Sequence, residues 1–334
     1  MRQTGGFPGE FASFRQGASL WFAPIRRANS GNGPTFRLRW RLVLGMAPWF
    51  SGDRSTQPPL VSIRISDSAS HRRSRFQGRT GVYVSCSTLC FSKLPLDDAL
   101  KTIRDLRFAK VDLAIHAPGP HLRPVDIVPD PTRISQRLKS ANIPFGAFHA
   151  EFGDATPTEQ TKQLRAICRL ARLMAVPVVT VPVAPLGADF DQETERIAVW
   201  CEIAASDGVI LSVETHSETI TADPAGALEL CKRVPGLGLT LDPSHYLIGP
   251  HAGVDYDDLF PYVRHVMMRD TAPGAGGFQV RVGQGHTEFG RVVSQLERFR
   301  FDRALTVDIR DVPDNSFPVE PEVRKLKYLL ESLV

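Results

Sequence analysis

The sequence from residue 82 onward alternates short apolar runs with longer amphipathic stretches, and this alternation constrains the fold more than any other feature. The stretches between the runs carry apolar residues at helical spacing, such as Leu96, Leu100 and Ile103. Strands that alternate with helices form a parallel sheet. The eight predicted strands are Val82–Ser87, Val111–His116, Pro144–His149, Val176–Val181, Val209–Glu214, Leu237–Leu241, His265–Arg269 and Ala304–Ile309.

Three helix starts are marked by a capping residue followed by proline, at Asp130-Pro131, Thr156-Pro157 and Asp223-Pro224. Eight strand–helix units within residues 81–334 match the length of a (β/α)₈ barrel. An open doubly wound sheet is the main alternative, but residues 86–89 after the first strand contain no glycine to cradle a phosphate. The predicted fold class is therefore α/β, with a TIM barrel over residues 81–334.

Residues 1–80 differ from the rest of the chain in charge and composition. They carry 13 Arg, no Lys and three acidic residues, a net charge of +10, whereas residues 81–334 carry 27 basic and 33 acidic residues, a net charge of −6. The first segment is rich in Gly, Ser and Pro without a sustained hydrophobic period, so we expect it to be disordered. Three interpretations stay open: a flexible tail, an Arg-rich targeting or nucleic-acid-binding arm, and a start codon assigned too early.

The cysteines and the apolar runs indicate the cellular compartment of the protein. Five cysteines spread over the chain are an odd number, which suits buried or reduced thiols better than a disulfide framework. No apolar run reaches the roughly 18 residues that a membrane-spanning helix needs; the nearest, residues 42–50, is interrupted by Gly45 and Pro48. We therefore expect a cytoplasmic protein with no membrane partner.

Polar residues interrupt the apolar pattern at the ends of several predicted strands. The C-terminal ends of barrel strands meet at one mouth, which is where catalysis takes place in this fold. Buried charges cost several kcal/mol unless they are paired or coordinated, so carboxylates and imidazoles that converge there indicate a metal site with nitrogen and oxygen ligands. The strongest ligand candidates are Glu214, Asp242 and His265, and Asp308 is a fourth.

Four motifs in this order resemble those of the xylose isomerase-like TIM-barrel superfamily, the sugar phosphate isomerase/epimerase family. Residues 213–216 (VETH) resemble its strand-5 E-x-H motif, and residues 241–245 (LDPSH) resemble its D-x-x-H motif. Residues 265–270 (HVMMRD) resemble the strand-7 motif, usually H-x-x-x-K-D. Residues 282–285 (VGQG) resemble its G-x-G loop, which either forms a tight turn or receives an anion at the following helix. The resemblance covers about three quarters of the chain.

The resemblance implies a metal-dependent sugar or sugar phosphate isomerase or epimerase. The reaction would be proton transfer through an enediolate, with Glu214 and Asp308 as the paired base and acid. One divalent ion, Mn²⁺, Mg²⁺, Co²⁺ or Zn²⁺, would be held by Glu214, Asp242, His265 and Asp308. His245 and Arg269 would contact a small-molecule carbohydrate substrate. His116 and His149 are candidates for further substrate contacts, with a structural role as the alternative, and His216 is expected to face solvent.

Two positions depart from the family pattern. Strand 8 has Asp308 where the family usually has Glu, and a carboxylate withdrawn by one methylene can cost roughly 10²-fold in rate. Dehydration or one-base isomerisation would then be favoured. Strand 7 has Arg269 where the family usually has Lys. A guanidinium cannot act as a base near neutral pH, and its bidentate fork favours a carboxylate or phosphate on the substrate.

Two other functions stay open. Endonuclease IV-type enzymes of the same superfamily also have His on strands 2 and 3, but they build a three-metal cluster with a D-x-H element before the G-x-G loop. Residues 277–279 read Gly-Phe-Gln at that place, and the net charge of −6 disfavours a nucleic acid partner. The second alternative is a non-catalytic sugar-binding barrel. The oligomeric state is left open, with a homo-oligomer among the options.

Overall fold

The computed structural model describes residues 81–334 except 275 and 314. The segment 1–80, for which disorder is predicted, lies outside the described residues. Within the described part, none of the helices combines the length and the apolar character needed to cross a membrane.

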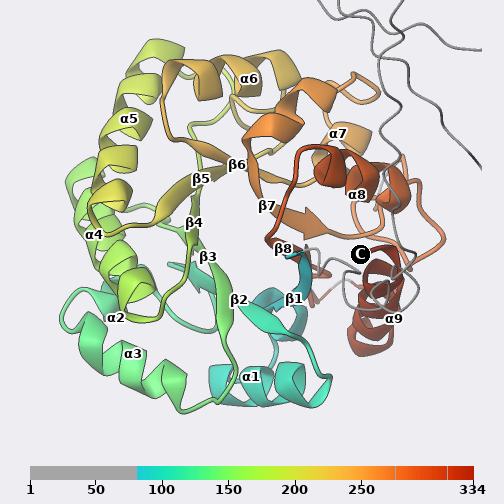
Figure 1. Ribbon diagram of the computed structural model, residues 1–334, viewed down its shortest axis with the longest axis horizontal. Helices are drawn as coiled ribbons and strands as arrows, with labels where there is room; N and C mark the ends of the chain where they lie inside the picture. Colours follow the sequence, from blue (N-terminus) through green and yellow to red (C-terminus); the bar gives the residue numbers. More distant parts are fainter. Residues whose placement is uncertain (1–80, 275, 314) are drawn as a thin grey trace, which may run out of the picture. The chain divides into compact units, whose positions relative to one another are not determined.

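Eight parallel strands close into a barrel in sequence order, with β8 hydrogen-bonded back to β1. Figure 1 shows these strands at the centre and the helices around them. The strands are β1 Tyr83–Ser87, β2 Lys110–His116, β3 Phe145–Glu151, β4 Val178–Val181, β5 Ile210–Glu214, β6 Gly238–Leu241, β7 Val263–Met268 and β8 Ala304–Val307. The predicted TIM barrel is confirmed.

The helices lie between the strands along the chain, as the alternating pattern predicts. They are α1 Leu96–Asp105, α2 Pro124–Ile127, α3 Pro131–Lys139, α4 Pro157–Leu173, α5 Phe190–Ser206, α6 Pro224–Arg233, α7 Ser244–Ile248, α8 Phe289–Arg298 and α9 Val319–Leu333, with 3₁₀ turns η1 Thr88–Phe91 and η2 Asp257–Tyr262. The three predicted caps are confirmed: Asp130, Thr156 and Asp223 each accept a hydrogen bond from a first-turn amide.

The hydrophobic core includes alternate residues of each strand together with the apolar faces of the helices. On β2, Val111, Leu113 and Ile115 belong to this core, whereas Asp112 lies on the opposite face of the strand. This period of two places every second strand residue inside the barrel. The helices therefore cover one face of the sheet, and the other face lines the barrel interior.

The barrel interior holds a layer of small polar residues. The Thr240 hydroxyl hydrogen-bonds with Thr180 at 2.7 Å and with Ser212 at 2.8 Å. Thr306 is bonded on the opposite side, to Ser85 at 2.6 Å and to Nε2 of His265 at 2.7 Å. These side chains are fully buried or nearly so. Because they satisfy one another, they form a polar floor beneath the barrel mouth.

The connection between β7 and α8 folds around the carboxylate of Asp270. This carboxylate accepts hydrogen bonds from the backbone amides of Gly283 at 2.7 Å, Gly285 at 2.9 Å, Thr271 at 3.1 Å and Thr287 at 3.3 Å. A Cβ on Gly285 would lie 2.1 Å from Asp270 Oδ1, so only glycine allows this approach. The anion bound by the G-x-G loop is therefore a side chain of the protein itself.

Replacing Asp270 with Asn should destabilise the barrel, because one charged acceptor for four backbone amides is lost. Hydrogen bonds to charged groups are worth about 1.5–3 kcal/mol each, so we expect D270N to lower the free energy of unfolding by about 2–4 kcal/mol. Urea denaturation measures this change. The exposed Asp302 is the matched control, and equal effects of D302N and D270N would contradict the role of the loop.

Candidate active site

Three carboxylates meet at the C-terminal mouth of the barrel. Glu214 ends β5, Asp242 follows β6 and Asp308 follows β8, and their exposed fractions are 8%, 0% and 0%. Asp242 is oriented by the turn that begins α7, because its Oδ1 accepts hydrogen bonds from the amide and the hydroxyl of Ser244. Such buried carboxylates need cationic or coordinating partners.

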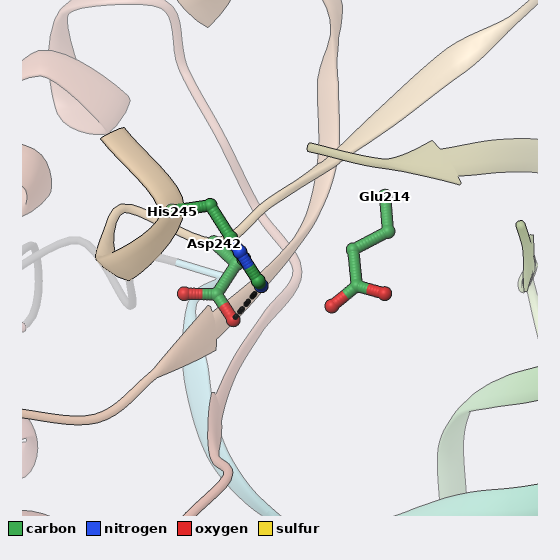
Figure 2. A group of neighbouring side chains, drawn as sticks. All are labelled: Glu214, Asp242 and His245. Carbon is green, nitrogen blue, oxygen red and sulfur yellow. Dashed lines mark ion pairs between the residues drawn. The ribbon is translucent and has the colours of Figure 1, made fainter. Parts of the chain in front are cut away.

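Glu214, Asp242 and His245 lie close together (Figure 2). Each offers one ligand atom, and the three atoms lie within 4.8 Å of one another. Among the residues that the structure describes, this is the one group of three with such spacing. His245 stands on the first turn of α7, and its Nε2 lies 3.8 Å from Asp242 Oδ2. The D-x-x-H spacing thus brings both side chains to one side of the mouth.

The ring of His245 is fixed by the loop after β5. The backbone amide of Ser217 donates to Nδ1 at 3.2 Å, so Nδ1 acts as an acceptor. Burial lowers the pKa of His245 to about 4, which leaves the imidazole neutral near neutral pH. A neutral ring that accepts at Nδ1 carries its proton on Nε2. The Nε2–H of His245 is therefore a hydrogen-bond donor at the mouth.

The guanidinium of Arg269 lies between Asp242 and Asp308 and is completely buried. Its Nη1 lies 2.9 Å from Asp242 Oδ2, and the two groups form an ion pair without a hydrogen bond. Its Nη2 donates to Asp308 Oδ2, and its Nε donates to the backbone carbonyl of Asp308 at 3.0 Å. Nη1 also donates to the Ser244 hydroxyl at 3.3 Å. One permanent cation thus bridges two of the three carboxylates.

Residues 277–279, where an endonuclease IV-type enzyme would carry metal ligands, support the arginines of the mouth. The ring of Phe278 lies 4.5 Å from the guanidinium carbon of Arg269. The Gln279 side chain accepts from the amide of Arg310 at 2.7 Å and donates to its carbonyl at 2.9 Å. This segment therefore shields one arginine and fixes the backbone of the other.

Arg310 is a residue that the sequence analysis did not select. Its Nε donates to Asp308 Oδ2 at 3.4 Å, and its Nη2 lies 3.9 Å from Glu214 Oε1. Burial lowers the pKa of Arg310, but Asp308 and Glu214 more than offset this and raise it. Burial likewise raises the pKa of Asp308, yet Arg269 and Arg310 bring it down to about 2. Arg310 follows Asp308 by two positions just beyond β8, the spacing at which side chains of an extended segment point the same way.

A cavity of about 220 Å³ opens above Glu214. Its volume lies below the roughly 300–1,000 Å³ of typical ligand sites, which fits a small substrate. Charged and titratable side chains make up much of its wall: His116, His149, Glu151, Glu214, His216 and Arg310. The expectation that His216 faces solvent is only partly met, since its ring lies 4.1 Å from that of His245 and lines this cavity.

The pKa values of the two strand-end histidines are shifted in opposite directions. His149 Nε2 lies 3.4 Å from Glu214 Oε2. Burial lowers the pKa of His149, but the Glu214 carboxylate outweighs it and raises the pKa. Burial raises the pKa of Glu214, but His149 and Arg310 outweigh it and hold the pKa well below its usual range. Burial lowers the pKa of His116 to about 3, so this imidazole is neutral near neutral pH.

The structure brings together Glu214, Asp242, His245, Arg269 and Asp308, but it separates His265 from them. The His265 ring faces Asp112 Oδ2 at 3.1 Å and the Thr306 hydroxyl inside the barrel. His265 precedes Arg269 by four residues, which is roughly 13 Å along a strand. Arg269, which directly follows β7, is therefore the residue that reaches the mouth, and the predicted four-ligand set is not assembled.

Asp308 also departs from its predicted role as an acid or base. It does not line the cavity, and its Oδ2 is bound by both arginines. The shorter side chain leaves this carboxylate at the base of the mouth, where it holds the guanidinium groups in place. Proton transfer by Asp308 is therefore not supported by the geometry.

A model of the xylose isomerase-like TIM barrel family matches residues 100–331, more than half of the chain. The chain belongs to this family. This identification confirms the resemblance carried by the four motifs. A search of curated proteins found no significant match.

Solved structures share the fold at low identity. A D-tagatose 3-epimerase-like protein is 19% identical, with a TM-score of 0.59 over 75% of this chain and 98% of that chain. The probable 3-DHS dehydratase of Bacillus anthracis is 16% identical, with a TM-score of 0.57 over 73% and 98%. A xylose isomerase-like protein of Mycobacterium smegmatis in complex with magnesium is 15% identical, with a TM-score of 0.59 over 75% and 98%.

The pair formed by His149 and Glu214 predicts a pH-dependent stability. Because the pKa of His149 is raised above 6.5, its contribution is complete below pH 6.5 and is lost as the pH rises through the native value. Glu214, with its lowered pKa, contributes at every pH above its usual 4.5. The melting temperature of the wild type should therefore exceed that of H149Q most near pH 4.5–6.5 and less in alkali.

His116 provides a control, because its contribution to stability should depend on pH in the opposite direction. Its pKa is lowered to about 3, so the difference between wild type and H116Q should be constant above pH 6.5 and should shrink in acid. Thermal melts across this pH range separate the two cases. A difference between wild type and H149Q that grows in alkali would contradict the ion pair.

Proposed function

We propose that this barrel is an enzyme of the sugar isomerase/epimerase kind, which moves a proton next to the carbonyl of a small carbohydrate. The observation that carries the proposal is the environment of Glu214. Its Oε2 is paired with His149, while its buried Oε1 accepts no hydrogen bond from the described residues. Because its pKa is lowered, the carboxylate is ionised near neutral pH. An ionised carboxylate with a free oxygen at a cavity wall has the protonation state and the position that a general base needs.

The first step would remove a proton from the carbon beside the substrate carbonyl. Glu214 Oε1 takes this proton, the C–H electrons form a carbon–carbon double bond, and the carbonyl π electrons move to oxygen. Arg310, whose Nη2 lies 3.9 Å from the same Glu214 oxygen, supplies positive charge where the enediolate oxygen forms. His245, predicted to contact the substrate, does not line this cavity, and its buried Nε2 has no hydrogen-bond partner among the described residues.

The second step depends on how many bases reach the substrate. Asp308 is buried beneath the arginines, so Glu214 is the carboxylate best placed to return the proton. Return to the former carbonyl carbon, with a proton passing between the two oxygens, completes an aldose–ketose isomerisation. Loss of a neighbouring hydroxyl, which takes up a proton and leaves as water, completes a dehydration. The geometry favours these one-base reactions over epimerisation between two opposed bases.

The divalent ion expected from the sequence does not fit its predicted ligands. His265 faces the barrel interior, and Arg269 already pairs with Asp242 and Asp308. The spacing of Glu214, Asp242 and His245 resembles a ligand set, but His245 presents an N–H rather than a lone pair at Nε2. The proposed steps therefore use the side chains of the chain alone.

The cavity, Arg310 and the cysteines indicate the size and charge of the substrate and the cellular compartment. The small cavity suits a single sugar or a hydroxy acid of similar size. Arg310 would pair with a carboxylate or phosphate on that substrate. The five cysteines are free, which fits a reducing compartment such as the cytoplasm.

Replacing Glu214 with Gln should abolish the proton transfer while leaving the fold intact. General bases contribute typically 10²–10⁴-fold, so we expect kcat for E214Q to fall by about 10³-fold. The measurement is incorporation of solvent deuterium next to the carbonyl, followed by NMR over a panel of aldoses, ketoses and keto acids. The exposed Glu218 on the following loop supplies the control variant E218Q, which should retain full exchange.

Two results would count against the proposal. Exchange by E214Q at the wild-type rate would remove Glu214 from the role of base. Binding of a sugar by the wild type without any exchange would favour the non-catalytic sugar-binding barrel instead.

A further inference from the structure

The two arginines of the mouth already provide cationic partners for its carboxylates. Glu214, Asp242 and Asp308 supply three negative charges, and Arg269 and Arg310 supply two positive charges. His149 Nε2 lies 3.4 Å from Glu214 and is a further partner of that carboxylate. Burying carboxylates is tolerated when each has a cationic partner. A divalent ion would add two positive charges beside two buried guanidinium groups.

The guanidinium of Arg269 has the contacts expected of a built-in cation. It joins the end of β7 to the residues after β6 and β8, the same elements on which the sequence analysis placed three of the four ligands. Its side chain is 0% exposed, so a small movement does not bring the guanidinium into contact with water. An arginine stays charged at all physiological pH values.

The neighbours of Arg269 hold it in this position. Phe278 covers its guanidinium, and the Ser244 hydroxyl accepts from Nη1. The next residue, Asp270, is anchored by four backbone amides, and the Thr287 hydroxyl donates to the carbonyl of Arg269 at 3.0 Å. Swinging the side chain away would break its contacts with Phe278 and Ser244, and it would leave Asp242 without the guanidinium and Asp308 with Arg310 alone.

The remaining ligand atoms do not favour an ion beside this guanidinium. Metal–oxygen distances are about 2.0–2.2 Å for Zn²⁺ and Mg²⁺, so an ion on Asp242 Oδ2 would lie close to Nη1 and be repelled. His ligands normally donate from the second ring nitrogen, whereas His245 accepts there from Ser217.

We propose that the Arg269 guanidinium takes the place of the divalent cation in this barrel, so that the protein binds no metal at its mouth. The two departures from the family pattern, Arg269 and Asp308, then act together in replacing the ion. Arg269 on strand 7 brings the positive charge, and the short Asp308 on strand 8 leaves room for it. The proposal concerns binding and is independent of the reaction proposed above.

The test is titration of the full-length chain, freed of metal with a chelator, with MnCl₂ alone in a calorimeter. We expect no stoichiometric binding by the wild type up to about 1 mM Mn²⁺, and none by R269K, which keeps the charge. R269Q removes the cation and should gain about one Mn²⁺ per chain. Its melting temperature should then rise by roughly 5–10 °C at about 100-fold excess over Kd, while that of the wild type should not change.

Each outcome decides the proposal. Uptake of one Mn²⁺ per chain by the wild type, lost in D242N, would overturn it, as would uptake by R269K. A folded R269Q that takes up no Mn²⁺ would show that the carboxylates are not a cation site. If R269Q does not fold, the wild-type and R269K titrations still give the answer. Because no substrate is needed, failure here is distinguishable from failure of the proton-transfer proposal.

Discussion

The mouth of this barrel depends on the ion pairs that Arg269 makes with Asp242 and Asp308. They join the ends of three strands through one buried charge. Without that charge, two fully buried carboxylates would face each other in a medium that screens them poorly. The same pairs hold Asp242 and Asp308 away from the cavity, whereas Glu214 lines it. A single cation therefore determines both the stability of the mouth and which of these three carboxylates is available to a substrate.

The rest of the site is arranged around this constraint. The polar layer inside the barrel fills the space below the mouth and engages His265, which keeps that imidazole away from the carboxylates. Above the mouth, Gln279 fixes the backbone of Arg310, whose charge faces the cavity. His149 lies 3.4 Å from the other oxygen of Glu214. The base thus has a permanent cation, Arg310, beside one of its oxygens, which suits a reaction that develops negative charge on a substrate oxygen.

Much of the fold could be predicted from the sequence because local patterns determine it. Strand alternation, helix periodicity and caps such as Asp130 are properties of short segments, and the structure agrees with them. The convergence of Glu214 and Asp242 could also be predicted, since both stand where a parallel strand ends. His265 could not be placed correctly, because its depth along β7 decides whether it reaches the mouth. The bridging role of Arg269 depends on distances between three strands, which no local pattern contains.

The most direct test of the central claim is a crystal structure grown with MnCl₂, with diffraction data collected at the manganese absorption edge. The account predicts a guanidinium between Asp242 and Asp308 and no anomalous peak at the mouth. An anomalous peak in contact with Glu214 and Asp242, with the Arg269 side chain displaced, would contradict it.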